Sequence, residues 1–254
     1  MTQWIELDGV VNMRDLGGLP TRDGRRTRDR RLVRSDNLQD LSPTDVRRLV
    51  DEVGVTDVVD LRTSTERELT GPGPLTETPL AHHHLSFIVE DPAATAQRAL
   101  LLRGEHEREE RTGDFWSRHY LGYLEQRPDS VAGALSVIAT SRGGTVVHCA
   151  AGKDRTGTVT ALALSVAGVP DEEIIDDYAL TAERISQIFE RLIDVEPYRS
   201  GLQGRSLEEQ TPQPETMATI LRTLAEDHGG AEGWLREQGW DDERLDRLRS
   251  RLVD

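Results

Sequence analysis

The chain has 254 residues, a formal net charge of −15, and 36% hydrophobic and 30% charged residues. This length suits one substantial core, so we expect a single domain over residues 1–254. The acidic balance argues against a general nucleic-acid or anionic-membrane surface, because such partners need a basic face. No apolar run approaches the roughly 18 residues of a membrane span, and no signal sequence is visible. We therefore expect a cytoplasmic protein without stable membrane insertion, and signal-independent export stays open.

Two residue types occur only once. Cys149 is the only cysteine, which excludes an intrachain disulfide. Lys153 is the only lysine among 31 basic residues, and the other 30 are arginines. This skew indicates a base-composition bias that makes each arginine uninformative by itself. A lysine that survives the bias indicates a place where a compact ammonium is needed instead of a planar guanidinium.

The first third of the chain predicts a turn, a helix and two strands. An Asp-Gly pair within residues 22–25 is typical of a tight hairpin, ahead of a short strand at 31–34. A Ser-Pro pair opens a helix over 42–54, which ends at a glycine. The β-branched run at 55–61 predicts a buried parallel strand, and a second strand is expected near 83–87.

The middle of the chain is expected to be helical from residue 91 to about 142, with helix starts at Asp91, Asp114 and Pro128. Within it, residues 96–112 are highly charged, which is typical of a solvated helix or a mobile lid. Asp114 precedes two aromatic residues and superficially resembles a mobile acid loop, but we favour a helix N-cap there.

The last part of the chain predicts a short buried strand at 145–148, a loop, and a strongly apolar helix around 161–164. Mostly helix follows, interrupted by a loop at 197–214. Three further helices are expected at the end of the chain, at 215–226, 230–237 and 241–252. Helices alternating with a few buried strands give an α/β layer architecture, enriched in helix towards the C-terminus.

The loop between that strand and helix has the spacing Cys-x5-Arg, with Cys149 and Arg155 at its ends. Such a loop places unpaired backbone N–H groups and the positive end of a helix dipole around a tetrahedral dianion. Gly152 permits the tight curl, and Arg155 offers a bidentate fork to two phosphate oxygens. His148 precedes the sulfur, and Thr156 can hydrogen-bond it. The residues expected to bind phosphate are Ala150, Ala151, Gly152, Lys153, Asp154 and Arg155.

Two other interpretations compete with that of a phosphate-binding cysteine loop. An isolated cysteine is most often a small buried hydrophobe, but the histidine, glycine and arginine at matching offsets make coincidence a poor explanation. A nucleotide-binding loop fails because Asp154 replaces the required Ser/Thr and Val147 stands where its first glycine belongs.

The segment HCAAGKDRTG at residues 148–157 resembles the protein-tyrosine phosphatase signature His-Cys-x5-Arg-[Ser/Thr]. With NMRDLGG at 12–18 and DLR at 60–62, it resembles more specifically the bacterial atypical tyrosine phosphatase family. Similarities near residues 214–217 and 229–235 extend the resemblance over almost the whole chain. It implies a phosphatase-type central, mostly parallel sheet flanked by helices, a helical C-terminus, and hydrolysis of phosphate monoesters without metal or cofactor. A helical lid insertion would fit residues 91–126.

The mechanism we expect starts with attack of the Cys149 thiolate on phosphorus, which forms a cysteinyl-phosphate that water then cleaves. Arg155 and the loop amides hold the equatorial oxygens. A carboxylic acid suits protonation of the leaving oxygen. Asp154 in the loop and Asp60 at the end of a neighbouring strand are both candidates, and a structural salt bridge of Asp60 to Arg14 or Arg155 is an equal alternative.

Substrates implied by the resemblance are phosphotyrosine and phosphoserine/threonine proteins, small phosphomonoesters, and phosphoinositides. Lys153 would add a charge at the pocket mouth, which favours phosphoinositides, while the acidic surface opposes an anionic bilayer. Arg14 and Arg62 could line the pocket or form surface ion pairs. Arsenate reduction needs further cysteines, which the chain lacks, and a non-catalytic phosphate-binding module is the remaining rival.

Two other features have simple structural interpretations. The run His82-His83-His84 lies on an expected strand, where adjacent side chains alternate faces, so packing is favoured over a metal site. The tryptophans are expected to be core or helix-packing anchors. They are Trp4, Trp116, Trp234 and Trp240.

Overall fold

The computed structural model describes residues 3–90 and 113–254 and contains a six-stranded sheet of order β1-β2-β3-β6-β4-β5. Strands β3, β6, β4 and β5 run parallel, and β1 and β2 add an antiparallel edge. The strands are β1 (Gln3–Trp4), β2 (Arg14–Asp15), β3 (Leu32–Ser35), β4 (Val55–Asp60), β5 (Ala81–His84) and β6 (Gly144–His148).

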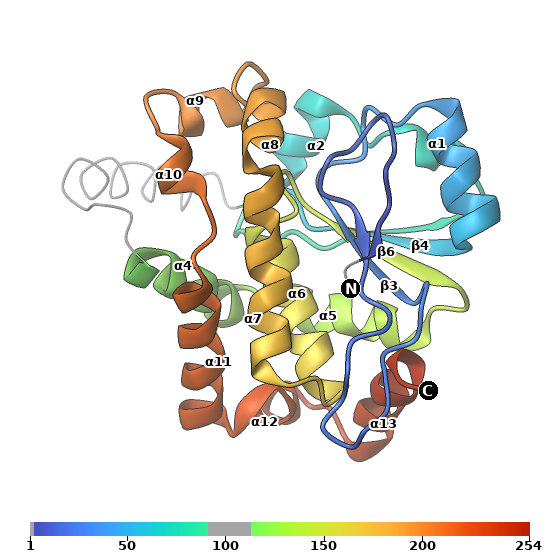
Figure 1. Cartoon of the computed structure of the whole chain (residues 1–254), viewed down its shortest axis with the longest axis vertical. Helices are drawn as coiled ribbons and strands as arrows, with labels where there is room; N and C mark the ends of the chain where they lie inside the picture. The colour runs from blue at the N-terminus through green and yellow to red at the C-terminus, as the bar shows by residue number, and fades with distance from the viewer. Residues whose placement is uncertain (1–2, 91–112) are drawn as a thin grey trace.

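Helices lie against this sheet and make up most of the C-terminal half (Figure 1). In the first half they are α1 (Pro43–Arg47), η1 (Arg48–Val53), α2 (Ser64–Thr70) and η2 (Pro74–Glu77). After residue 112 they are α4 (Gly113–Gln126), α5 (Pro128–Thr140), α6 (Asp154–Val166), α7 (Asp171–Leu180), η3 (Thr181–Arg184), α8 (Ile185–Leu192), α9 (Tyr198–Leu202), α10 (Leu207–Gln210), α11 (Pro214–His228), α12 (Gly230–Glu237) and α13 (Asp242–Leu252). The predicted α/β class, with a mostly parallel sheet and a helical C-terminus, is confirmed.

Alternating strand residues build a core on each face of the sheet. Val59 and Val147 belong to the larger core, which they share with buried residues of α5, α6, α7 and α11 to α13. Their neighbours Val58 and Val146 belong to a smaller core that includes Leu49 from η1. Because successive strand side chains point to opposite faces, the β-branched runs supply both cores at once. The sheet is therefore covered on both sides.

Local signals placed most elements correctly and two wrongly. The turn predicted at 22–25 is confirmed, with the Gly24 N–H donating to the Thr21 carbonyl at 2.9 Å. The strand expected near 83–87 lies earlier, because its ladder with β4 runs to the end of β4, where His84 pairs with Asp60. The loop expected at 197–214 contains α9 and α10 instead. A capping box between Ser206 and Glu209 starts α10, and this signal can be recognised in the sequence.

The predicted lid can be followed only at its end. Its residues 91–112 lie outside the described residues, and α4 covers the rest of the segment assigned to it. Asp114 lies in the first turn of α4, and its side chain is outside the described part. Among the helices that are described, we find none both long and apolar enough to cross a membrane.

The parallel strands bring their carboxyl ends to one edge of the sheet, where open α/β sheets place ligands. At this edge β6 leads into the Cys149 loop, and the registers place the ends of β3 and β4 beside it, with both Ser35 and Asp60 opposite His148. Helices α8, α9 and α10 gather near α2 at the top of Figure 1, away from α11 to α13. Residues of α8 and α9 line a cavity at this edge of the sheet.

Candidate active site

The loop that joins β6 to α6 folds tightly against the end of β3. Gly152 has φ +65°, a left-handed conformation that disfavours other residues. A Cβ built there would lie 2.5 Å from the Ser35 carbonyl oxygen and 2.6 Å from the Asp36 nitrogen. Glycine is therefore required both by the turn and by the close approach of two backbones.

The loop carbonyls are held on its outer side. Ala150 O accepts from the backbone N–H of Asn37 at 3.0 Å. Ala151 O accepts from Asn12 Nδ2 at 2.9 Å, and Gly152 O accepts from Arg34 Nη2 at 2.7 Å. Within the described part of the chain, none of the backbone N–H groups of residues 150–155 donates a hydrogen bond. These donors are left for an oxyanion, as in other anion-binding loops.

Cys149 begins this loop, with only 1% of its surface exposed. The expected hydrogen bond from Thr156 to its sulfur is not formed. Thr156 Oγ1 is buried and has no hydrogen-bond partner among the residues that the structure describes. Thr156 lies in the first turn of α6, and its hydroxyl donates neither to a helix carbonyl nor to the sulfur among the described residues.

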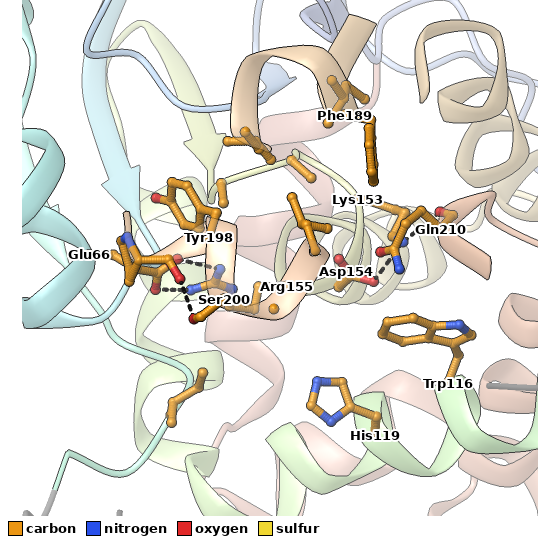
Figure 2. Close-up of a pocket in the computed structure, with 18 of the residues that line it drawn as sticks. Glu66, Trp116, His119, Lys153, Asp154, Arg155, Phe189, Tyr198, Ser200 and Gln210 are labelled. Atoms are coloured by element: carbon orange, nitrogen blue, oxygen red, sulfur yellow. Dashed lines mark hydrogen bonds and ion pairs between the residues drawn. The ribbon is translucent and has the colours of Figure 1, made fainter. Parts of the chain in front are cut away.

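Arg155 is held by Glu66, a carboxylate that the motif at residues 148–157 does not reveal. Its Nη1 and Nη2 contact Glu66 Oε2 and Oε1 at 2.6 and 2.8 Å (Figure 2), and Nη1 also donates to the Leu61 carbonyl at 3.3 Å. Its Nε makes no hydrogen bond within the described residues, so the side edge of the guanidinium remains for a ligand. Burial would raise the pKa of Glu66, but Arg155 lowers it below the usual value. Glu66 therefore stays ionised.

Asp154 is the first residue of α6 and lines the cavity with its side chain 21% exposed. The Tyr120 hydroxyl donates to Asp154 Oδ1 and lies 3.0 Å from the Tyr178 hydroxyl. Burial and the neighbouring carboxylate raise the pKa of Tyr120 well above its ordinary value, so this hydroxyl keeps its proton. One oxygen of Asp154 is thus fixed by a permanent donor.

Lys153 does not project from the pocket mouth, contrary to the expectation from sequence. It is only 4% exposed, and its ammonium donates to the Gln210 carbonyl at 2.7 Å. The same ammonium lies 4.7 Å from the centre of the Trp116 ring, which is drawn below Lys153 in Figure 2. Trp116 therefore lines this site, whereas Trp234 and Trp240 are core residues as expected.

Asp60 lies at the end of β4 with its carboxylate already engaged. Arg62 donates to both of its oxygens, from Nε at 3.0 Å and from Nη2 at 2.8 Å. His148 Nε2 is 3.7 Å from Asp60 Oδ1. Burial would raise the pKa of Asp60, but His148 and Arg62 hold it well below the usual range. Burial lowers the pKa of His148 to about 4, so this ring is neutral at pH 7.

Neither Arg14 nor Arg62 lines the cavity, and their ion pairs are buried, so both alternatives predicted for these arginines are wrong. Both are fully buried. The Arg62 guanidinium donates hydrogen bonds to Asp60, Thr70 and the Gly71 carbonyl. Arg14 donates to Asp177 and Asn12 behind the loop. Buried guanidinium groups need such partners, so these arginines support the loop from outside.

The histidine run on β5 has ordinary partners. The rings of His82, His83 and His84 hydrogen-bond the Leu75 carbonyl, the Asp57 carboxylate and the Arg62 carbonyl, respectively. Among the described residues, no group of three or more histidine, cysteine or acidic side chains is arranged to hold a metal ion.

A cavity of about 640 Å³ opens over the loop. Its floor includes Ala150, Ala151 and Arg155, and its walls come largely from α4, α8 and α9. The wall side chains are mostly aromatic or aliphatic, among them Phe115, Trp116, Ile188, Phe189, Leu192 and Tyr198. This volume and lining are typical of a small-molecule or side-chain pocket with a polar floor.

The family model described as the tyrosine phosphatase family matches residues 5–254. The chain belongs to the tyrosine phosphatase family. This phosphatase is 29% identical to the triple specificity protein phosphatase PtpB of Mycobacterium tuberculosis, over 98% of each chain. It is also 29% identical to a putative tyrosine-protein phosphatase of Cupriavidus necator, over 92% of this chain and 83% of the relative. The crystal structure of P. aeruginosa TpbA aligns over 86% of this chain and 95% of its own, with 14% identity and a TM-score of 0.35.

Proposed function

We propose that this phosphatase is a cysteine-dependent phosphate monoester hydrolase that acts on phosphotyrosine through a cysteinyl-phosphate intermediate, in one domain over the whole chain. The observation that carries the proposal is the orientation of the loop. Its carbonyls at residues 150–152 are tied outward, its N–H groups are left unpaired beside Cys149, and Arg155 stands at the helix start.

Two displacements at phosphorus complete the reaction. In the first, the Cys149 thiolate forms the sulfur–phosphorus bond while the ester oxygen leaves and takes a proton from Asp154. In the second, water attacks the phosphorus and gives a proton to the Asp154 carboxylate, and the sulfur leaves as thiolate. The side edge of Arg155 and the loop amides stabilise the equatorial oxygens in both transition states.

We assign the general acid to Asp154 rather than Asp60. Asp154 lines the cavity, while its Oδ1 accepts from Tyr120, which leaves Oδ2 to carry a proton. Asp60 is held ionised by Arg62, and its lowered pKa makes it a poor proton donor. Its position beside His148 suits it to orient that ring at the base of the loop.

The cavity supports an aryl phosphate as the preferred substrate. A phosphotyrosine ring entering between α4 and α8 would lie among Trp116, Ile188 and Phe189 with its phosphate on the loop. A phosphoserine or phosphothreonine ester would reach the same loop with fewer apolar contacts. A phosphoinositide headgroup would gain little from the charge of Lys153, because the Lys153 ammonium already donates to the Gln210 carbonyl.

The proposal is tested with p-nitrophenyl phosphate and a phosphotyrosine peptide in a chelator-containing buffer. We expect turnover by the unmodified protein, none above background for Cys149→Ser, and a phosphorylated Cys149 in rapid-quench mass spectrometry. Activity that survives Cys149→Ser would refute the mechanism. Tight binding of phosphopeptide by the unmodified protein without turnover would instead establish a non-catalytic phosphate-binding module.

A further inference from the structure

Behind the loop lies a buried ionic network that the proposed chemistry does not use. Its centre is Asp177 on α7, whose side chain is 6% exposed. Asp177 Oδ1 accepts from Arg14 Nε at 2.8 Å, and Oδ2 accepts from Arg34 Nη1 at 2.5 Å. Burial alone would raise the pKa of Asp177, but the two guanidinium groups lower it below its usual value. One carboxylate therefore fixes two buried arginines.

Each arginine of this network leads to a different carbonyl of the loop. Arg34 donates directly to Gly152 O at 2.7 Å. Arg14 donates to Asn12 Oδ1 at 2.6 Å, which turns the amide of Asn12 so that its Nδ2 donates to Ala151 O at 2.9 Å. The two routes share only Asp177, and they end on adjacent peptide groups.

We propose that Asp177 is a positioning residue of the phosphate site, which fixes the direction of two loop peptides through Arg34 and through the pair Arg14 and Asn12. A peptide is planar, so a carbonyl held outward turns the N–H of the following residue towards the loop interior. The carbonyls of Ala151 and Gly152 therefore orient the N–H groups of residues 152 and 153. This inference rests on the proposed function, since it matters only if the loop binds an oxyanion.

The network explains why so much charge is buried here. Two arginines and one carboxylate carry an unbalanced charge, and burying them costs folding free energy. Arg34 Nε adds to this cost, because it is buried without a hydrogen-bond partner among the described residues. The excess positive charge lies directly behind a site that must accept a dianion. A neutral set of hydrogen bonds could hold the carbonyls, but it would not add to the positive potential at the loop.

The test measures binding of an oxyanion instead of turnover. Sodium tungstate is titrated by calorimetry into Cys149→Ser protein and into the same protein carrying Asp177→Asn. We expect Asp177→Asn to weaken tungstate binding roughly tenfold or more, because loss of one aligned oxyanion donor costs on the order of 10²–10³ in rate elsewhere. In the otherwise unmodified enzyme, kcat/KM should fall by about 10²-fold, the cost of a misplacement of about 1 Å.

Asn12→Asp is the second variant, because Asp177→Asn leaves buried arginines short of negative charge. Asn12→Asp keeps an acceptor for Arg14 and balances the two arginines with two carboxylates, but it removes the donor to Ala151 O. We expect it to fold with a Tm close to that of the parent and still bind tungstate several-fold more weakly. Folding of every variant is checked by near-UV circular dichroism.

Asp45→Asn is the control for stability. Asp45 is also buried and accepts from backbone N–H groups, at Gly9 and Ser42, but it contacts no part of the loop. It should lower Tm without changing tungstate affinity. Unchanged tungstate affinity in folded Asp177→Asn and Asn12→Asp proteins would overturn this inference alone. A Cys149→Ser parent that binds no tungstate would contradict the proposed function itself.

Discussion

Gly152→Ala tests whether the loop must approach β3 as closely as the structure shows. The added Cβ would meet backbone atoms of Ser35 and Asp36 at 2.5 and 2.6 Å, so either the loop or β3 has to move by several tenths of an ångström. The left-handed conformation costs an alanine roughly 1–2 kcal/mol, and overpacking costs a further 1–3 kcal/mol. We therefore expect the free energy of unfolding to fall by about 2–5 kcal/mol.

Gly152→Ala should also lower the activity of the protein that remains folded. A shift of this size moves the N–H groups that we propose bind phosphate, so kcat/KM should fall by about 10²-fold at temperatures where the variant is folded. The assays are urea unfolding and hydrolysis of p-nitrophenyl phosphate. Gly168→Ala is the matched control, because Gly168 has φ +80° but open space around its Cβ position. If Gly152→Ala matches Gly168→Ala in stability and in kcat/KM, the close-approach argument is wrong.

Three further predictions concern the proton donor, the arginine clamp and the response to pH. Asp154→Asn should lower kcat by about 10²–10⁴-fold on a phosphotyrosine peptide. The loss on p-nitrophenyl phosphate should be much smaller, because its leaving group needs less help from an acid. Equal losses on both substrates, or a larger difference between the substrates in Asp60→Asn, would contradict the assignment of the acid to Asp154. Glu66→Gln should destabilise the fold by about 3–5 kcal/mol in urea unfolding, since it leaves the buried Arg155 without its charge partner. It should also weaken the binding of inorganic phosphate. An unchanged Ki for inorganic phosphate would argue against a role of Glu66 in holding Arg155 for the ligand. Because the pKa of His148 is lowered to about 4 in the folded protein, the unfolded chain binds its proton more readily, so stability is full above pH 6.5 and is lost as pH falls towards 4. The His148 contribution between pH 7 and pH 5 should be about 2 kcal/mol, measured as the extra loss of unfolding free energy relative to His148→Asn, and equal losses in both proteins would refute it.

Local sequence signals predicted the Cys149 loop and the elements around it, because strands, caps and turns are read from neighbouring residues. They could not predict which distant side chains complete the site. Asn12 and Arg34 contact the loop across 139 and 118 residues of sequence. In a chain with 30 arginines, nothing local distinguishes Arg34 from a surface arginine.

Glu66 shows the same limit in another form. Its capping box with Thr63 is a recognisable start for α2, but the pattern does not reveal that the same carboxylate also clamps Arg155. Lys153 was predicted at the pocket mouth, and this prediction was wrong because the side chain is buried. Its rarity drew attention to the loop, but the direction of its side chain depends on Gln210. That residue lies in the short helix α10, where a loop was expected.

The long sequence separations of the tethers bear on how activity is acquired during folding. A newly made strand-loop-helix unit around Cys149 already contains the proposed nucleophile, but its peptide groups gain their outer partners only when the first 40 residues and α7 have docked. Closing such long segments costs chain entropy and is slow compared with forming helices. In a refolding experiment, phosphatase activity should consequently return late, after most of the helical circular dichroism signal. An incompletely assembled chain would have the Cys149 thiol but no activity.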